Sequence, residues 1–225
     1  MHGGSLALPK SAGEAHRCLA YGAWLGYHRE MKIRVHGVTP ESSVNGPGKR
    51  AVVHLQGCSL GCGGCFNPHT HAVAGGVMWE VSELAERLLE SDPDGVTISG
   101  GEPLEQLEET AGLVAALRAR GAASIAIFSG YAMEEIREMP GGVSLLGAID
   151  LLVAGRYDAQ RPSQSPLLSS ENQRLHFLSS VHTPAELDWD GGRVEITIRP
   201  DGSLHMTGFP DPGLRRAVRG LGESD

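Results

Sequence analysis

Cysteine is scarce in this chain of 225 residues, which contains only four. Four cysteines are too few for a disulfide scaffold, and a domain of this size buries a core without covalent cross-links. No apolar run reaches the roughly 18 residues that a membrane-spanning helix needs. Residues 1–10 also lack the long apolar stretch of an export signal. We therefore expect a cytoplasmic protein with no membrane partner.

Basic charge is also in short supply. Lysine and arginine number 19 against 27 aspartates and glutamates, so the formal net charge is -8. No basic stripe stands out, and we expect no tight binding to nucleic acid. With 40% hydrophobic and 20% charged residues, the composition is that of an ordinary globular protein and not of a disordered or fibrous one.

Short apolar segments alternate with helical patterns through the middle of the chain. Apolar runs predict strands at 31–38 (an edge strand), 51–56, 95–99, 124–128 and 145–153. Helical spacing of apolar residues predicts helices at 79–90, 104–120 and 132–139. Strands separated by helices of this length are typical of right-handed crossovers in a mainly parallel sheet. The sequence therefore predicts an α/β fold, with the sheet forming an open or partial barrel.

The two ends of the chain are expected to lie outside this core. Residues 1–30 form an N-terminal extension, with a helix over 18–27 on the outside of the domain, and residues 31–178 form the core. Residues 179–225 form a C-terminal extension. In it, strands at 194–199 and 203–207 meet across Pro200-Asp201-Gly202, which predicts a β-hairpin. Prolines and glycines predict a loop at 39–50.

Three of the four cysteines fall within the eight positions of CSLGCGGC, as Cys58, Cys62 and Cys65. The glycines between them allow the loop to turn all three thiolates toward one small metal centre. A structural zinc ion takes four ligands, and Cys18 lies about 40 residues upstream. An iron–sulfur cluster held by three thiolates keeps one iron open to an outside ligand. The spacing favours such a cluster, with structural zinc or three unrelated buried thiols as alternatives. We expect Cys18 to be a buried or incidental thiol.

A second motif, Gly100-Gly101-Glu102-Pro103, follows the strand predicted at 95–99. Two glycines at the carboxyl end of a strand let a ligand approach the backbone closely, and Glu102 adds an acceptor for an amino group. Taken alone, this segment is more often just a turn.

The two motifs together, in this order, resemble those of the radical S-adenosylmethionine (SAM) superfamily. More narrowly, the chain is similar to the activating enzymes of glycyl radical enzymes, above all to that of anaerobic ribonucleotide reductase. The resemblance extends over about residues 31–178 and implies the partial (open) parallel β/α barrel of the radical SAM type. The residues that carry it are Asn45-Gly46-Pro47-Gly48 with Arg50, Cys58 through Pro68, Ser99 through Leu104, Ser129-Gly130-Tyr131, and Asn172-Gln173.

The resemblance implies two cofactors. A [4Fe-4S] cluster is held by Cys58, Cys62 and Cys65, and the methionyl amine and carboxylate of SAM bind its fourth iron. The reduced cluster cleaves SAM to a 5'-deoxyadenosyl radical that abstracts hydrogen, while the protein binds, orients and excludes water and oxygen.

The resemblance also implies roles for residues around these cofactors. Gly100, Gly101 and Glu102 hold the methionine amine, and Ser129 lies near the methionine or the ribose. Arg156 either pairs with the methionine carboxylate, which a planar guanidinium suits, or is a solvated loop arginine. Asn67 and Asn172 line the site or act as turn residues.

The histidines near these motifs have simpler interpretations. His69 and His71 closely follow the cysteine segment, where an exposed loop position is expected more than contact with the cluster or substrate. His54 lies inside a predicted strand and is expected to be a hydrogen-bonded core residue.

The chain departs from the family pattern at some positions. It has Ala154-Gly155 where Asp-Gly is usual, its segment Ser169 to Gln173 is out of step by one residue, and it is longer at both ends. We favour an enzyme that places a radical on a glycine of a separate glycyl radical enzyme, with a flavodoxin or ferredoxin as electron donor. One alternative is a radical SAM tailoring enzyme that acts directly on a peptide or small metabolite. The other is a non-catalytic iron–sulfur electron-transfer module.

Overall fold

The computed structural model describes the whole chain except residues 1–30, 188–192, 199, 203 and 220–225. The N-terminal extension, its helix expected at 18–27 and Cys18 therefore lie outside the described residues. In the described part, no helix combines the length and the apolar character needed to cross a membrane.

A seven-stranded sheet, in the order β3-β1-β2-β4-β5-β6-β7, is the centre of the fold. Neighbouring strands β2, β4, β5 and β6 are parallel, whereas β1, β3 and β7 are antiparallel to their neighbours. The strands are β1 (Lys32–Ser42), β2 (Arg50–Leu55), β3 (Val77–Glu80), β4 (Gly95–Gly100), β5 (Ile125–Ser129), β6 (Leu151–Ala154) and β7 (Arg174–Phe177). The α/β class and the parallel-rich sheet are confirmed. Because β3 and β7 are edges in the described residues, the sheet is not a closed barrel.

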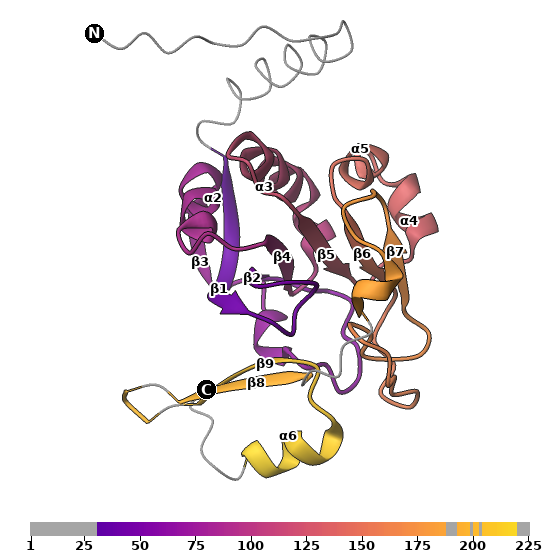
Figure 1. Cartoon of the computed structure of the whole chain (residues 1–225). Coiled ribbons are helices and arrows are strands. Elements are labelled where there is room, and N and C mark those ends of the chain that lie inside the picture. Colours follow the sequence, from indigo (N-terminus) through magenta and orange to yellow (C-terminus); the bar gives the residue numbers. More distant parts are fainter. Residues whose placement is uncertain (1–30, 188–192, 199, 203, 220–225) are drawn as a thin grey trace, which may run out of the picture.

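The helices pack against one face of this sheet (Figure 1). They are α2 (Val81–Leu89), α3 (Leu107–Ala119), α4 (Met133–Glu138) and α5 (Gly142–Leu146). The described part of the chain also contains short 3-10 turns, η1 (Pro68–Thr70), η2 (Pro103–Gln106) and η3 (Pro184–Leu187). Alternate residues of β2, Val53 and Leu55, belong to the same buried cluster as Leu84 of α2 and Leu113 of α3. Period-two strands and helical stripes thus meet in one core, as burial of apolar surface requires.

The opposite face of the sheet carries a second, smaller apolar cluster. Val153, Leu167, Leu187 and Phe209 form that second cluster, with Phe128 packed against it. The larger buried core therefore lies on the face toward the helices, and the other face is less completely packed.

Three sequence expectations about the elements were wrong. Strand β3 precedes α2 and pairs with β1, with Ile33 opposite Trp79, so β1 is an interior strand and not an edge. Strand β1 also continues to Ser42, inside the expected loop. Of the expected strand at 145–153, the first two residues belong to α5, and β6 begins only at Leu151. Apolar periodicity predicted α2. Strand β3 has only four residues, which is too short for a clear apolar pattern, so its formation depends on pairing with β1.

The C-terminal part forms a separate two-stranded antiparallel sheet of β8 (Val194–Ile198) and β9 (Leu204–Gly208), followed by α6 (Pro212–Arg219). This unit lies below the main sheet in Figure 1. Hydrogen bonds join it to the core: Ser43 N–H donates to Glu195 Oε1 at 2.8 Å, and the Arg193 guanidinium donates to the carbonyls of Ser163 (2.8 Å) and Leu168 (2.9 Å).

Candidate functional site

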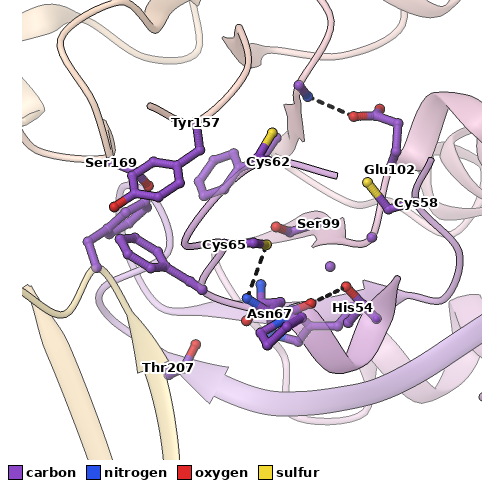
Figure 2. Close-up of a pocket in the computed structure, with 18 of the residues that line it drawn as sticks. His54, Cys58, Cys62, Cys65, Asn67, Ser99, Glu102, Tyr157, Ser169 and Thr207 are labelled. Carbon is purple, nitrogen blue, oxygen red and sulfur yellow. Dashed lines mark hydrogen bonds between the residues drawn. The ribbon is translucent and has the colours of Figure 1, made fainter. Parts of the chain in front are cut away.

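A cavity of about 690 Å³ opens on the face of the sheet that the helices leave free. This volume falls within the roughly 300–1,000 Å³ typical of small-molecule and cofactor sites. Parallel strands β2 and β4 end at the cavity, which is where open α/β sheets commonly bind ligands. The sequence-predicted residues that line it are Cys58, Cys62, Cys65, Asn67, Gly100, Gly101, Glu102 and Ser129. Figure 2 shows the three cysteines around this space, with Glu102 on one side and Thr207 on another.

The cysteine loop is closed by backbone hydrogen bonds at its base. Gly57 N–H donates to Thr70 O at 2.7 Å, and Cys58 N–H donates to His71 O at 3.1 Å. Gly61 and Gly64 have positive φ angles of 59° and 75°, which favour glycine over other residues. This geometry turns the loop back on itself, so the three thiols, which form no disulfide, lie half-buried along one cavity.

Three thiols on one loop are the donor set that an iron–sulfur cluster uses. In the described part of the chain, no group of three or more histidine, cysteine, aspartate or glutamate side chains is arranged to hold one metal ion. One tetrahedral zinc with bonds near 2.3 Å requires its sulfur ligands within about 4 Å of one another. In a cluster each thiolate binds a different iron, which allows wider spacing. The donor set therefore fits an iron–sulfur cluster.

The Gly-Gly-Glu turn packs directly against the base of the cysteine loop. Gly101 N–H donates to Leu55 O at 2.8 Å, and Glu102 N–H donates to Gly57 O at 2.9 Å. A Cβ atom at Gly100 would collide with the backbone of β2, and one at Gly101 would collide with Gly57 O. These glycines are therefore needed for the close approach of the two motifs, in addition to any ligand contact.

Glu102 is 1% exposed, and both of its carboxylate oxygens accept hydrogen bonds. Oε1 accepts from the Leu104 N–H (2.9 Å) and the Ser129 hydroxyl (2.8 Å), and Oε2 accepts from the Gly130 N–H (2.7 Å). Burial raises the pKa of Glu102 to about 7, although these three donors oppose the shift. Glu102 therefore positions the end of β5 as well as lining the cavity.

Cys58 lies close to this carboxylate. Burial, followed by the negative charges of Glu102 and Glu105, raises the pKa of the Cys58 thiol, and the backbone N–H groups of Leu60 and Gly61 partly counter these effects. The free thiol is consequently held in its neutral form, and a bound metal would displace the proton.

Arg156 and Asn172 are not among the residues that line the cavity. Arg156 forms an ion pair with Glu135 at 3.0 Å, and its guanidinium carbon lies 5.4 Å from the centre of the Tyr131 ring. The Asn172 side chain donates to Arg156 O at 2.6 Å. Arg156 thus belongs to an exposed cluster beside the site. Asn67 does line the cavity, and its backbone N–H donates to Cys65 Sγ at 3.4 Å.

Sequence reasoning missed part of the cavity lining. His36 of β1 and residues 204–210 of the C-terminal unit line it, although no local motif marks them. His54 also lines the cavity, and its ring has no hydrogen-bond partner among the described residues. The expectation of a hydrogen-bonded core histidine was therefore wrong. The face of β2 that carries His54 borders the cavity, whereas the face that carries Val53 and Leu55 packs in the core.

Comparison with known proteins agrees with this site. Residues 44–176 match the family described as "4Fe-4S single cluster domain". The anaerobic ribonucleoside-triphosphate reductase-activating protein of Enterobacteria phage T4 is 34% identical over 144 residues, which cover 61% of this chain and 90% of the phage protein. The protein of the same name from Salmonella typhi is 27% identical over 158 residues, covering 65% of this chain and 99% of that protein. The pyruvate formate-lyase-activating enzyme of Clostridium pasteurianum is 44% identical over 81 residues, covering 33% of this chain and only 34% of that enzyme.

The sheet, the cysteine loop and the family match define an α/β iron–sulfur protein. The chain belongs to the 4Fe-4S single cluster domain family and, within the radical SAM superfamily, to the activating enzymes of glycyl radical enzymes. It is an oxidoreductase whose cofactors are a [4Fe-4S] cluster and SAM.

Proposed function

We propose that this protein activates a partner glycyl radical enzyme by removing a hydrogen atom from one of its glycines. The supporting observation is the junction of the two motifs, where Glu102 N–H donates to Gly57 O at 2.9 Å beside the cysteine loop. The phage activating protein, 90% of whose length is matched by this chain, also supports the proposal.

Cys58, Cys62 and Cys65 would hold the cluster and keep one iron open for the methionyl amine and carboxylate of SAM. When bound, the cluster supplies the electron that cleaves SAM to methionine and a 5'-deoxyadenosyl radical. The Asn67 N–H, already directed at Cys65 Sγ at 3.4 Å, would stabilise negative charge on that sulfur.

The remaining residues would bind and orient SAM. The backbone of Gly100 and Gly101, with Glu102 behind it, would hold the methionine amine. Ser129, positioned by Glu102, would lie near the methionine or the ribose. Arg156 would pair with the methionine carboxylate from the edge of the site. Phe66 and Tyr157, whose ring centres lie 4.8 Å apart beside the loop, would exclude water from the radical.

The fold and setting are part of the same proposal. The open sheet would be a partial barrel of the radical SAM type within the core of residues 31–178, with residues 1–30 and 179–225 as extensions. The end of the family match at residue 176 supports this division. A flavodoxin or ferredoxin would supply the electron, and the cytoplasm would supply the reducing conditions that keep the thiols free.

The decisive experiment uses the full chain with its cluster reconstituted without oxygen. SAM, a reductant and a glycyl radical enzyme encoded beside this protein are added, and electron paramagnetic resonance is recorded. A glycyl doublet on the partner is expected, and it should vanish when the partner's radical glycine is replaced by alanine. SAM cleavage without a doublet on any such partner would contradict the proposed activity.

One observation favours a second candidate, a tailoring enzyme acting directly on a peptide or metabolite. Residues 204–210 line the cavity although they lie beyond the family match. Part of the cavity wall is therefore formed by residues outside the region that this chain shares with the family. Formation of 5'-deoxyadenosine that rises with an added peptide or metabolite, in the absence of a glycyl radical enzyme, would support this candidate. Any cleavage of SAM would exclude a pure electron-transfer module.

A further inference from the structure

Histidines from three separate elements line the same cavity as the cysteines. They are His36 of β1, His54 of β2 and His205 of β9, and His69 and His71 of the segment after the cysteines also line the cavity. Strands β1 and β2 are paired next to these positions, with Gly37 opposite His54. The ring of His205 is tied to β1 through a 3.0 Å hydrogen bond between its Nε2 and Thr39 Oγ1. Residues far apart in the sequence thus form one wall.

The hydrogen bonds around His36 determine which of its nitrogens carries the proton. Gln56 Nε2 donates to His69 O at 3.0 Å and to Ala72 O at 2.6 Å, which fixes the orientation of the side-chain amide. Gln56 Oε1 can only accept, so His36 Nδ1, 2.8 Å away, is the donor. Nε2 of a neutral His36 is therefore an acceptor.

His54 differs because no side chain or backbone group of the described residues is hydrogen-bonded to its ring. Burial, followed by the charges of His205 and His36, lowers the pKa of His54 to about 4. The ring is therefore neutral near pH 7, with one N–H donor and one acceptor nitrogen. A group with one donor and one acceptor complements a peptide amide, which also has one of each, better than it complements an anion.

A glycine target creates a particular recognition problem. Glycine has no side chain to bind, so an enzyme that acts on it must recognise the backbone of the segment around it. Polar groups in a cavity that stay unpaired until the correct substrate binds are also a strong source of discrimination.

We propose that His54, flanked by His36 and His205, forms a peptide subsite that binds the backbone amides beside the target glycine. This inference rests on the proposed function and names the groups that recognise its substrate. The C-terminal unit contributes to the subsite through His205, and this gives the segment beyond the family match a role in the choice of partner.

The test measures binding of a blocked peptide that copies the glycine segment of the partner. Isothermal titration calorimetry is performed under anaerobic conditions on the cluster-loaded, SAM-bound protein. His54→Leu, which keeps bulk but removes both hydrogen-bonding atoms, should raise the Kd of the peptide about 10-fold or more. His54→Gln, which keeps a donor and an acceptor, should restore most of the affinity.

His176→Leu is the matched control, because His176 lies on β7 and is not among the cavity-lining residues. It should leave the peptide Kd unchanged. Iron content and near-ultraviolet circular dichroism establish that each variant is folded and loaded.

Equal peptide affinities of the wild-type, His54→Leu and His54→Gln proteins would overturn the subsite, as would a wild-type protein that binds no peptide. A tenfold or greater loss in His54→Leu, with recovery in His54→Gln, supports it even when electron paramagnetic resonance detects no glycyl doublet. In that last case only the proposed radical transfer fails, so the two failures are distinguishable.

Discussion

The side-chain amide of Asn45 donates a hydrogen bond of 2.8 Å to Thr207 Oγ1, joining the loop before β2 to strand β9. The same amide donates to Ser42 Oγ at 2.8 Å, and Asn45 O accepts from the Thr97 hydroxyl at 2.7 Å. Asn45 is therefore a buried junction between β1, β4 and β9. It lines the cavity too, so the C-terminal unit is connected to the site through it.

Thr207→Val is expected to loosen this connection. The substitution keeps the shape of the side chain but removes the acceptor, at a cost of about 1 kcal/mol. Trypsin should then cleave faster at Arg193, at the start of β8. Thr197→Val, at an exposed position of the neighbouring strand, is the control and should leave the cleavage rate unchanged. Equal rates for all three proteins would contradict a role for this hydrogen bond.

Arg50 is expected to be a main stabilising residue of the core. It is fully buried and donates to Thr97 Oγ1 (2.7 Å), Pro47 O (3.1 Å) and Val96 O (2.7 Å), among other acceptors. Burial lowers the pKa of Arg50 to about 10, so it remains charged at neutral pH. Arg50→Met would leave these buried acceptors without a donor. It should reduce the free energy of unfolding, measured by urea denaturation, by roughly 3–5 kcal/mol.

Lys49→Met provides the comparison for Arg50, because Lys49 is exposed and its side chain pairs with the exposed Glu41. Its cost should stay below about 1 kcal/mol. Arg50→Lys keeps the charge but lacks the forked donor group, so it should also be destabilised. An Arg50→Met protein as stable as the Lys49→Met protein would refute the assignment.

Each cysteine of the loop is expected to be required for the cluster. Replacing Cys58, Cys62 or Cys65 individually with alanine should remove most of the bound iron and sulfide and abolish SAM cleavage, because an iron without its thiolate is easily lost. Cys18→Ala is the matched control and should retain both. Loss of the cluster in Cys18→Ala would instead identify a fourth protein ligand and exclude the open iron.

Replacing Arg156 distinguishes a structural role of this residue from a role in SAM binding. Its ion pair with Glu135 is exposed on both sides, so Arg156→Met should change the free energy of unfolding by less than about 1 kcal/mol. If Arg156 holds the methionine carboxylate, the same variant should weaken SAM binding about 10-fold, the loss expected for a charge-assisted pair worth roughly 1.4 kcal/mol. Glu135→Gln removes the ion pair but keeps the arginine and should bind SAM normally. Normal SAM affinity in Arg156→Met would leave Arg156 as a surface residue.

The pKa of His54 predicts a specific acid sensitivity. The unfolded chain takes up a proton on this ring as the pH falls through 6.5, whereas the folded protein does so only near pH 4. The stability contribution is therefore present above pH 6.5 and is lost as the pH falls toward 4, by about 3 kcal/mol at most. Urea denaturation of the cluster-free protein at pH 7 and pH 5 should show a smaller loss for His54→Gln than for the wild type. Identical losses would show that His54 titrates normally.

Much of the fold could be predicted from local pattern. The parallel strands β2, β4 and β5 and the helices α2 and α3 carry period-two or helical apolar spacing, and each was expected within a few residues of its observed bounds. Strands β3 and β7 were missed because they have only four residues each, and they form where β1 and β6 offer an edge to pair with.

The residues of the cavity also divide into those that local sequence predicts and those that it does not. Its cysteines and its Gly-Gly-Glu turn follow a spacing that the chemistry of a cluster and the close approach of two backbones impose on neighbouring residues. His36, His54 and His205 carry no such spacing, since they come from β1, β2 and β9.

The amino-acid sequence by itself determined the metal-binding motif, the α/β class and the family, because each depends on residues that are close together along the chain. Only the tertiary structure decided that Glu102 supports Ser129, that Arg156 turns toward Glu135, and that the C-terminal strand contributes to the cavity wall. The physical reason is that hydrogen bonds and burial join atoms that are close in space, and neither leaves a periodic mark on the sequence when the partners lie on different elements.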